Sequence, residues 1–298
     1  MRGPRGEPPP PRDLDRWRRA GRIGAAAREL GESLLVPGAS RLEVAEAVEA
    51  YIRREGALPA FPANLSIDEE AAHFTPPPGD SRRFAKGELV KLDVGAHLDG
   101  AISDTATTVE VGGGGRHAAL RQASRSALEA ASALLRPGVG TRELSDAIER
   151  AIRSQGYRPV ENLSGHTIEE YLLHAGTSIP NASGFSSREL RSGEVVAIEP
   201  FATGGGGAVG NGPFGNILRF REAPDPERAP ELSELYGRFR TLPFCLRWIE
   251  DEALRARVLR ERKRLQTYPV FVEVRGGYVS QAERTFLLTE EGCEVLTP

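Results

Sequence analysis

The sequence repeats part of itself at a spacing of about one hundred residues. Three pairs of segments match in the same order, with offsets of 100, 98 and 106 residues. The pairs are 37–56 with 137–156, 64–66 with 162–164, and 87–93 with 193–199. Both members of the first pair have apolar residues at helical spacing and end at a glycine, which predicts a helix. Three ordered matches indicate an internal duplication, and a period this long predicts two αβ halves related by a pseudo-two-fold axis rather than a solenoid.

The apolar patterns of the whole chain predict a mixed α+β fold. Helices are expected over 13–35 and 116–135, and strands over 87–95, 101–111, 194–203 and 216–221 and near 268–274, 277–289 and 293–296. Between about 225 and 266, three prolines lead into a charged segment dense in Leu and Arg, which we interpret as a helical insertion in the second half. The Pro-rich residues 1–12 are expected to form a disordered tail.

Charge and cysteine content exclude several classes of protein. Lys and Arg total 39 against 42 Asp and Glu, and the resulting net charge of −3 argues against a nucleic-acid-binding protein. The 2 cysteines are too few for a disulfide framework or a cysteine-based zinc site. The chain has no run of about 18 apolar residues, and its basic start lacks the apolar run of a signal peptide. We therefore expect a cytoplasmic protein without a membrane span.

The duplication aligns one acid with another. Asp93 and Glu199 occupy equivalent positions, each after an apolar run. A buried carboxylate is costly unless it is paired or binds a cation. Taken singly, either acid fits a solvated strand end, but as a pair they predict a site on the pseudo-axis. Asp104 lies eleven residues beyond Asp93. Across a turn at Asp99-Gly100 these two acids are expected to face each other as a cross-strand pair, which is destabilising unless a cation bridges them.

Glu283 and three histidines complete a candidate ligand set. Glu283 is expected in the middle of a strand among apolar neighbours, where a charge needs a partner. His73, His166 and His174 follow the repeated Asn-Leu-Ser segments. Four carboxylates and one imidazole suit two divalent ions, and bridging acids would hold such ions about 3.5–4 Å apart.

At these residues the sequence resembles the methionine aminopeptidases of type II, most closely their archaeal subgroup. The matching segments are 59–66, 71–73, 91–95, 99–100, 104–105, 162–166, 174–176, 197–203, 242–244 and 268–269. The resemblance implies one catalytic domain over 13–298 with the duplicated "pita-bread" fold and a central site. A helical insertion such as that at about 225–266 marks type II members.

The resemblance also implies a metal centre and a reaction. The five implied ligands are Asp93, Asp104, His166, Glu199 and Glu283. They would hold two divalent ions, for which Co, Mn, Fe and Zn are all suitable. A hydroxide held by the ions would attack the first peptide carbonyl while Glu199 carries the proton. The implied activity is removal of the initiator methionine from nascent chains whose second residue is small.

Further residues are assigned to the substrate by the same resemblance. His73 matches the histidine near the substrate amine and the scissile amide, and His174 matches one that hydrogen-bonds the carbonyl oxygen. Phe61, Leu173 and Tyr268 match positions around the methionine pocket. The implied partners are the N-termini of nascent polypeptides, the implied state is a monomer, and a link to the ribosome stays open.

One departure from the family pattern lies beside the last ligand. The family has Phe-Glu-His-Thr where this chain has Ala282-Glu283-Arg284-Thr285. On a strand, Arg284 points to the face opposite Glu283, so ligation is expected to survive. A neighbouring histidine often supports a ligand, however, and its loss would weaken metal binding about 10–100-fold.

Two other functions stay open at the level of sequence. An Xaa-Pro aminopeptidase or prolidase-like enzyme uses the same five ligands, although the helical insertion and Leu242-Pro243-Phe244 argue against it. A metal-free binding protein on the same fold would explain Arg284 but not five intact ligands.

Three remaining features are interpreted without a functional role. The run Gly204–Gly207 predicts a bend, because it lacks the Gly-Lys-Ser/Thr ending of a phosphate loop. The charged stretch 255–264 predicts a solvated helix face, because acidic residues are interleaved. His97 and His117 are expected in solvent, since one lies near a turn and the other beside a glycine loop.

Overall fold

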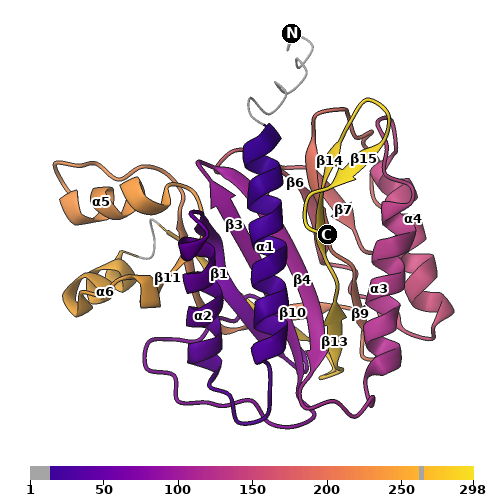
Figure 1. Cartoon of the computed structure of the whole chain (residues 1–298), viewed down its shortest axis with the longest axis horizontal. Coiled ribbons are helices and arrows are strands. Elements are labelled where there is room, and N and C mark those ends of the chain that lie inside the picture. The colour runs from indigo at the N-terminus through magenta and orange to yellow at the C-terminus, as the bar shows by residue number, and fades with distance from the viewer. Residues whose placement is uncertain (1–13, 262–264) are drawn as a thin grey trace.

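The computed structural model describes residues 14–261 and 265–298, so the predicted tail 1–12 lies outside the described residues (Figure 1). The helices are α1 (Leu14–Leu34), α2 (Arg41–Arg54), α3 (Ala118–Ser132), α4 (Thr141–Ser154), α5 (Pro230–Phe239) and α6 (Glu252–Arg260), with a 3-10 helix at Leu246–Trp248. The first eight strands are β1 (Leu58–Ile67), β2 (Glu70–Ala72), β3 (Leu89–Leu98), β4 (Ala101–Glu110), β5 (Arg158–Pro159), β6 (Ser164–Ile168), β7 (Ser178–Pro180) and β8 (Val195–Ile198). The others are β9 (Phe201–Thr203), β10 (Val209–Phe220), β11 (Phe244–Cys245), β12 (Leu265–Glu273), β13 (Val279–Gln281), β14 (Arg284–Leu288) and β15 (Cys293–Val295).

The predicted duplication is confirmed in the backbone hydrogen bonds. The N–H of Gly38 donates to the carbonyl of Phe84, and the N–H of Gly138 donates to the carbonyl of Leu190. The same offsets of 100 and 106 residues relate two isolated backbone bridges, Ser40 with Arg83 before α2 and Gly140 with Glu189 before α4. Equivalent residues therefore make equivalent contacts in both halves, as expected of two copies of one αβ unit.

The first half is a three-stranded antiparallel sheet, in the order β1-β3-β4, covered on one face by α1 and α2 (Figure 1). Two glycines let α1 lie close to its neighbours, because a Cβ at Gly21 would collide with the carbonyl oxygen of Leu296 and one at Gly24 would lie 2.5 Å from Ser103 Oγ. The core between helices and sheet is largely aliphatic, and it includes Leu65 and Leu92.

The second half places α3 and α4 beside a five-stranded sheet in the order β15-β14-β8-β6-β7 (Figure 1). A separate apolar core fills the space between them. An isolated bridge between Ala106 of β4 and Glu283 joins this sheet to the sheet of the first half. The join brings the acidic residues of both halves together.

The predicted insertion contains α5, the 3-10 helix and α6, which lie to one side of the two halves (Figure 1). It also contains the short strand β11, and β12 begins within its predicted end at Leu265. Its own apolar cluster includes Leu232 and Phe244. Within α6 only Val258 is buried, so the solvated helix face predicted for 255–264 is confirmed over 255–260, while 262–264 lie outside the described residues.

Four expectations about local structure are wrong. Residues 194–203 do not form one strand, because β8 ends at Ile198 and β9, which belongs to another sheet, begins at Phe201. Residues 277–289 do not form one strand, because the chain leaves its pairing with β9 at Gln281 and pairs with β8 from Arg284 onward. His97 and His117 are not in solvent, with only 6% and 8% of their surface exposed. His97 Nδ1 accepts the Gly100 N–H at 3.3 Å and so helps to close the turn.

The glycine run joins β9 to β10 in a bend, as expected. The N–H groups of Gly206 and Gly207 donate to the Glu273 carboxylate, so an internal acid occupies the concave backbone that a phosphate would otherwise fill. Within the described part of the chain, no helix is both long and apolar enough to cross a membrane.

Candidate metal centre

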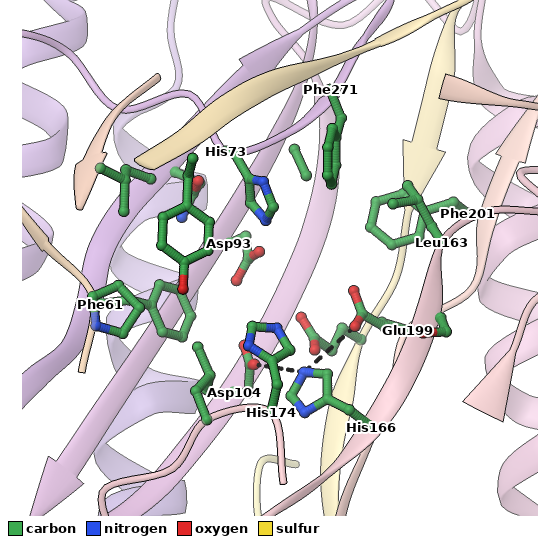
Figure 2. A pocket seen from close by; sticks show the side chains of 18 of the residues that line it. Phe61, His73, Asp93, Asp104, Leu163, His166, His174, Glu199, Phe201 and Phe271 are labelled. Carbon is green, nitrogen blue, oxygen red and sulfur yellow. Dashed lines mark ion pairs between the residues drawn. The ribbon is translucent and has the colours of Figure 1, made fainter. Parts of the chain in front are cut away.

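Four carboxylates from both halves of the fold point into one central cavity of about 240 Å³. Asp93 lies on β3, Asp104 on β4 and Glu199 directly after β8. Glu283 lies between β13 and β14, where its backbone pairs with β4. Asp104 and Glu283 are buried, with 4% and 1% of their surface exposed. Figure 2 shows Asp93, Asp104 and Glu199 turned toward the same space.

The pairing of β3 with β4 differs from the expected one. Asp93 lies opposite Ala106, and Asp104 lies opposite Gly95, so the two acids are diagonal neighbours rather than a directly opposed pair. Because they are two positions apart in register, both side chains still emerge on the same face of the sheet. The two carboxyl groups remain close enough for the charge of Asp104 to raise the pKa of Asp93.

His166 on β6 completes the cluster of polar ligands. Its Nε2 lies 3.5 Å from Asp104 Oδ2 and 3.5 Å from Glu199 Oε1 (Figure 2). Its Nδ1 lies 3.3 Å from the Thr167 carbonyl oxygen, which only accepts hydrogen bonds, so the proton is on Nδ1. Burial lowers the pKa of His166 to about 4, which keeps the ring neutral. The lone pair of Nε2 therefore faces the carboxylates, in the tautomer that a metal ligand requires.

The electrostatics of the cavity favour a bound cation. Burial raises the pKa of Asp104 to about 7 and, together with the charge of Asp104, holds the pKa values of Asp93, Glu199 and Glu283 well above their ordinary range. Asp93 Oδ1 and Asp104 Oδ1 are buried without a hydrogen-bond partner. Ligand atoms of Asp104, His166 and Glu283 all lie within 4.8 Å of one another. A bound cation would relieve the mutual repulsion that raises these pKa values, and a set of carboxylate oxygens with one imidazole nitrogen fits a divalent cation.

Gln281 is a residue of the site that the sequence did not single out. Its Nε2 donates to Glu283 Oε2 at 3.4 Å, while its Oε1 is buried without a partner. The same side chain hydrogen-bonds Asp93 and lowers the pKa of that acid, against the larger effect of burial. Gln281 lies two residues before Glu283, and in an extended chain two such residues share a face. This spacing could have placed Gln281 beside the proposed ligand from the sequence alone.

Arg284 lies where its strand position predicts. It is exposed, whereas Glu283 is buried, so the two side chains point to opposite faces. The arginine pairs with Ile198 across β14 and β8. Its guanidinium is therefore directed away from the ligand cavity.

The two remaining histidines line the same cavity, and Figure 2 shows them on different sides of it. His73 has a positive φ of 67°, a strained backbone conformation of the kind that clusters at functional sites. Its ring lies 4.5 Å from that of Phe271 and 5.1 Å from that of Tyr268, and burial lowers its pKa to about 4. His174 is more open to solvent, and its ring lies 4.3 Å from that of His166.

An apolar wall faces the carboxylates across the cavity. Phe61, Leu173 and Tyr268, which the sequence assigned to a substrate pocket, all line it and are largely buried. Residues that the sequence did not assign also line it, among them Asn64, Asn162, Ile217, Pro243 and Phe271. Pro243 belongs to the insertion, so that segment forms part of the cavity wall.

Known proteins resemble this chain in sequence and in fold. Residues 15–217 match metallopeptidase family M24. A methionine aminopeptidase of Pyrococcus abyssi is 43% identical over 295 residues, which cover 96% of this chain and 99% of that protein. One from Archaeoglobus fulgidus is 44% identical over 284 residues, with 93% and 96% of the two chains covered. A crystal structure of methionine aminopeptidase from Thermotoga maritima has a TM-score of 0.71 at 24% identity, covering 96% of this chain and 97% of that one.

The fold and these relatives thus define a metallopeptidase of the pita-bread type, as predicted. The chain belongs to metallopeptidase family M24, within the group of the archaeal methionine aminopeptidases.

Proposed function

We propose that this protein is a metal-dependent aminopeptidase that removes the N-terminal methionine from nascent polypeptides. The observation that carries the proposal is the convergence of four carboxylates and the imidazole of His166 on one cavity with an apolar wall. Its relatives of at least 40% identity that are named methionine aminopeptidases support the substrate.

Asp93, Asp104, His166, Glu199 and Glu283 would hold the metal. Four acids can neutralise two divalent ions, so we propose two ions per chain, with Mn, Fe, Co and Zn all suited to this mixture of oxygen and nitrogen donors. Divalent ions in such a site polarise a carbonyl and lower the pKa of bound water. Gln281 would orient two of the carboxylates through its amide.

The protein's own groups then position the peptide and move its protons. Glu199, whose pKa is raised by burial and by Asp104 and Asp93, is suited to accept a proton and return it to the leaving amine. His174, at the open side of the cavity, would donate a hydrogen bond to the carbonyl oxygen of the first peptide bond. His73 is neutral and would contact the amide that is cleaved.

Substrate choice would follow from the shape of the cavity. A volume of about 240 Å³ is at the small end for a ligand pocket, and it suits one side chain rather than a long peptide. Phe61, Leu173 and Tyr268 offer apolar contacts to an unbranched methionine side chain. A cavity of this size would exclude a bulky second residue beside the carboxylates, in agreement with the preference for small residues that the family resemblance implies. Assembly as a monomer and association with the ribosome stay predictions.

The experiment uses purified protein that is stripped of metal and reloaded with Mn, Co or Fe. Release of free methionine would be followed from Met-Ala-Ser, with Met-Arg-Ser and Ala-Pro-Gly as controls. We expect release from Met-Ala-Ser alone, only with metal, and its loss in Asp104→Asn.

Cleavage of Ala-Pro-Gly would assign the chain to the proline-specific enzymes instead. An absence of turnover with every metal would contradict the proposed activity.

A further inference from the structure

A buried ion pair lies outside the metal centre and links the insertion to the first half. Glu49 of α2 is only 1% exposed. Its carboxylate accepts hydrogen bonds from Arg247 Nη1 at 3.0 Å, Arg247 Nη2 at 2.7 Å and Trp248 Nε1 at 2.7 Å. It also accepts the backbone N–H of Ala63 at 3.1 Å. Four donors from two distant segments thus meet on one carboxylate.

Arg247 extends this network in the other direction. Its side chain is 3% exposed, and it donates to Thr75 Oγ1 at 2.9 Å and to the Pro76 carbonyl at 2.8 Å. Thr75 Oγ1 in turn donates to the Ala63 carbonyl at 2.8 Å. A buried ion pair is often no more stabilising than an apolar pair of the same volume, so stability alone does not account for this arrangement.

Three partners of the network lie close in sequence to residues that line the substrate side of the cavity. Ala63 lies in the irregular part of β1, between Phe61 and Asn64, where the register with β3 shifts. Thr75 follows His73 by two residues, and its N–H donates to the Gly215 carbonyl of β10 at 3.3 Å. Arg247 follows Pro243, the insertion residue that lines the cavity. One ion pair therefore holds three separate pieces of the substrate wall against each other.

No hydrogen bond of this network, among the residues that the structure describes, ends on any of the five proposed ligand side chains. Four of the ligands, Asp104, His166, Glu199 and Glu283, come from β4 and the second half of the chain, whereas the fifth, Asp93, lies on β3 opposite Asn64 of β1. Loosening the network is therefore expected to disturb the substrate wall, while these four ligands keep their geometry and Asp93 stays held by the pairing of β3 with β4.

The duplication supplies an internal reference for this role. Glu149 of α4 is the repeat equivalent of Glu49, and it pairs with Arg153 at 2.5 Å within its own helix and accepts the Ser183 N–H. The corresponding Arg53 lies 4.0 Å from Glu49, so Arg247 of the insertion has taken the place nearest the carboxylate. Neither Glu149 nor Arg153 lines the central cavity.

We propose that Glu49 and Arg247 are positioning residues of the aminopeptidase reaction, which fix the wall that bears Phe61, His73 and Pro243 and so set the preference for the first side chain of the substrate. The inference rests on the proposed function, since it concerns the substrate of that site. A displacement of about 1 Å in a positioned group can cost as much as 10²-fold in rate, so modest loosening has a measurable effect.

The test compares Glu49→Gln with Glu149→Gln in the metal-loaded full chain. Glu49→Gln keeps the shape but removes the charge that gathers four donors. We expect the KM for Met-Ala-Ser to rise about tenfold and the preference for Met-Ala-Ser over Leu-Ala-Ser to fall by a similar factor. The affinity of Glu49→Gln for Mn²⁺, measured by calorimetry, should stay within about twofold of the wild-type value. Glu149→Gln should match the wild type in KM, in substrate preference and in Mn²⁺ affinity.

Two results would overturn the inference. One is an unchanged KM and an unchanged Met-to-Leu ratio in folded Glu49→Gln, and the other is a loss of Mn²⁺ affinity in parallel with activity. If Glu49→Gln does not fold, Trp248→Phe removes a single donor from the same carboxylate, and it should raise KM about threefold, with no change again contradicting the inference. Failure of the wild type to release methionine would count against the proposed function. The ratios of KM and of substrate preference between variant and wild type test the positioning role of Glu49 and Arg247.

Discussion

The two halves of this protein share one αβ plan but contribute differently to the site. Equivalent hydrogen bonds link Gly38 to Phe84 and Gly138 to Leu190, so the backbone of the two copies has stayed alike. Of the proposed ligands, the first half supplies Asp93 and Asp104 from one hairpin. The second half supplies the imidazole and two glutamates from three separate places, in chain order His166, Glu199 and Glu283.

The surroundings of equivalent positions differ even more than the ligands do. Glu49 is buried under the insertion, whereas its equivalent Glu149 pairs with an arginine of its own helix. The hairpin of the first half turns at Asp99-Gly100, but the second half has a glycine-rich bend held by Glu273. A duplication therefore fixes where backbone atoms lie, and the elements packed around each copy decide what the side chains do.

The largest effect is expected when the two equivalent acids are compared. Asp93→Asn and Glu199→Gln should each lower kcat/KM for Met-Ala-Ser by about 10³-fold, because each removes a charge from the metal centre. Excess Mn²⁺ should partly restore Asp93→Asn but not Glu199→Gln, since only the second acid is proposed to carry a proton as well. Steady-state kinetics across a Mn²⁺ series would measure this, and equal rescue of both variants would contradict the division of roles.

A second comparison concerns stability at the other pair of equivalent acids. Glu49→Ala leaves Arg247 buried without its partner and should lower the free energy of unfolding by about 3–5 kcal/mol. Glu149→Ala removes a more exposed pair and should cost about 1 kcal/mol. Urea denaturation of the metal-free proteins would measure both, and similar losses at the two sites would show that the insertion does not depend on this ion pair.

A third, smaller effect is expected at the bend that only the second half has. Burial alone would raise the pKa of Glu273, but the N–H groups of Gly277, Arg275, Gly206 and Gly207 outweigh it and lower the pKa below its ordinary value of 4.5. A carboxylate whose pKa is lowered by folding stabilises the folded state at pH values above its ordinary pKa. This contribution is lost as the pH falls through the lowered pKa.

Glu273→Gln should therefore cost about 2 kcal/mol of unfolding free energy at pH 7. The difference from wild type should shrink as the pH falls below about 4.5. Denaturation midpoints at several pH values would test this, and a difference that grows on acidification would contradict the assigned sign.

The smallest effect is expected at Arg284, beside the last ligand. Because Arg284 is exposed on the face opposite Glu283, Arg284→His should change Mn²⁺ affinity by less than about threefold. Calorimetric titration would measure it. A gain of about 10–100-fold would mean instead that the missing histidine supports the ligand through the strand.

Much of the fold and of the candidate site follows from the sequence because the duplication is still visible in it. The repeat aligns Asp93 with Glu199, and the family motifs indicate the other ligands. The register of β3 and β4 could also have been predicted from the sequence. A two-residue turn at Asp99-Gly100 pairs Leu98 with Ala101, which places Ala106 and not Asp104 opposite Asp93.

Other features depend on contacts that no local pattern encodes. Arg247 meets Glu49 across a separation of 198 residues, and charge patterning gave no sign of which acid the insertion would reach. The break at Ala282-Glu283 arises because the chain passes from β9 to β8 while Glu283 pairs with Ala106. His97 is buried because its ring closes a turn, although the sequence around it is that of an exposed loop.

The most direct test of the account is a calorimetric titration of Mn²⁺ into the metal-free protein. Wild type is compared with Glu283→Gln, and Glu290→Gln serves as a control for the loss of an exposed acid a few residues away. The account predicts saturable binding in wild type and in Glu290→Gln, weakened about 10²-fold or more in Glu283→Gln. Absence of binding in wild type, or equal binding by all three proteins, would contradict a metal centre built from the buried carboxylates.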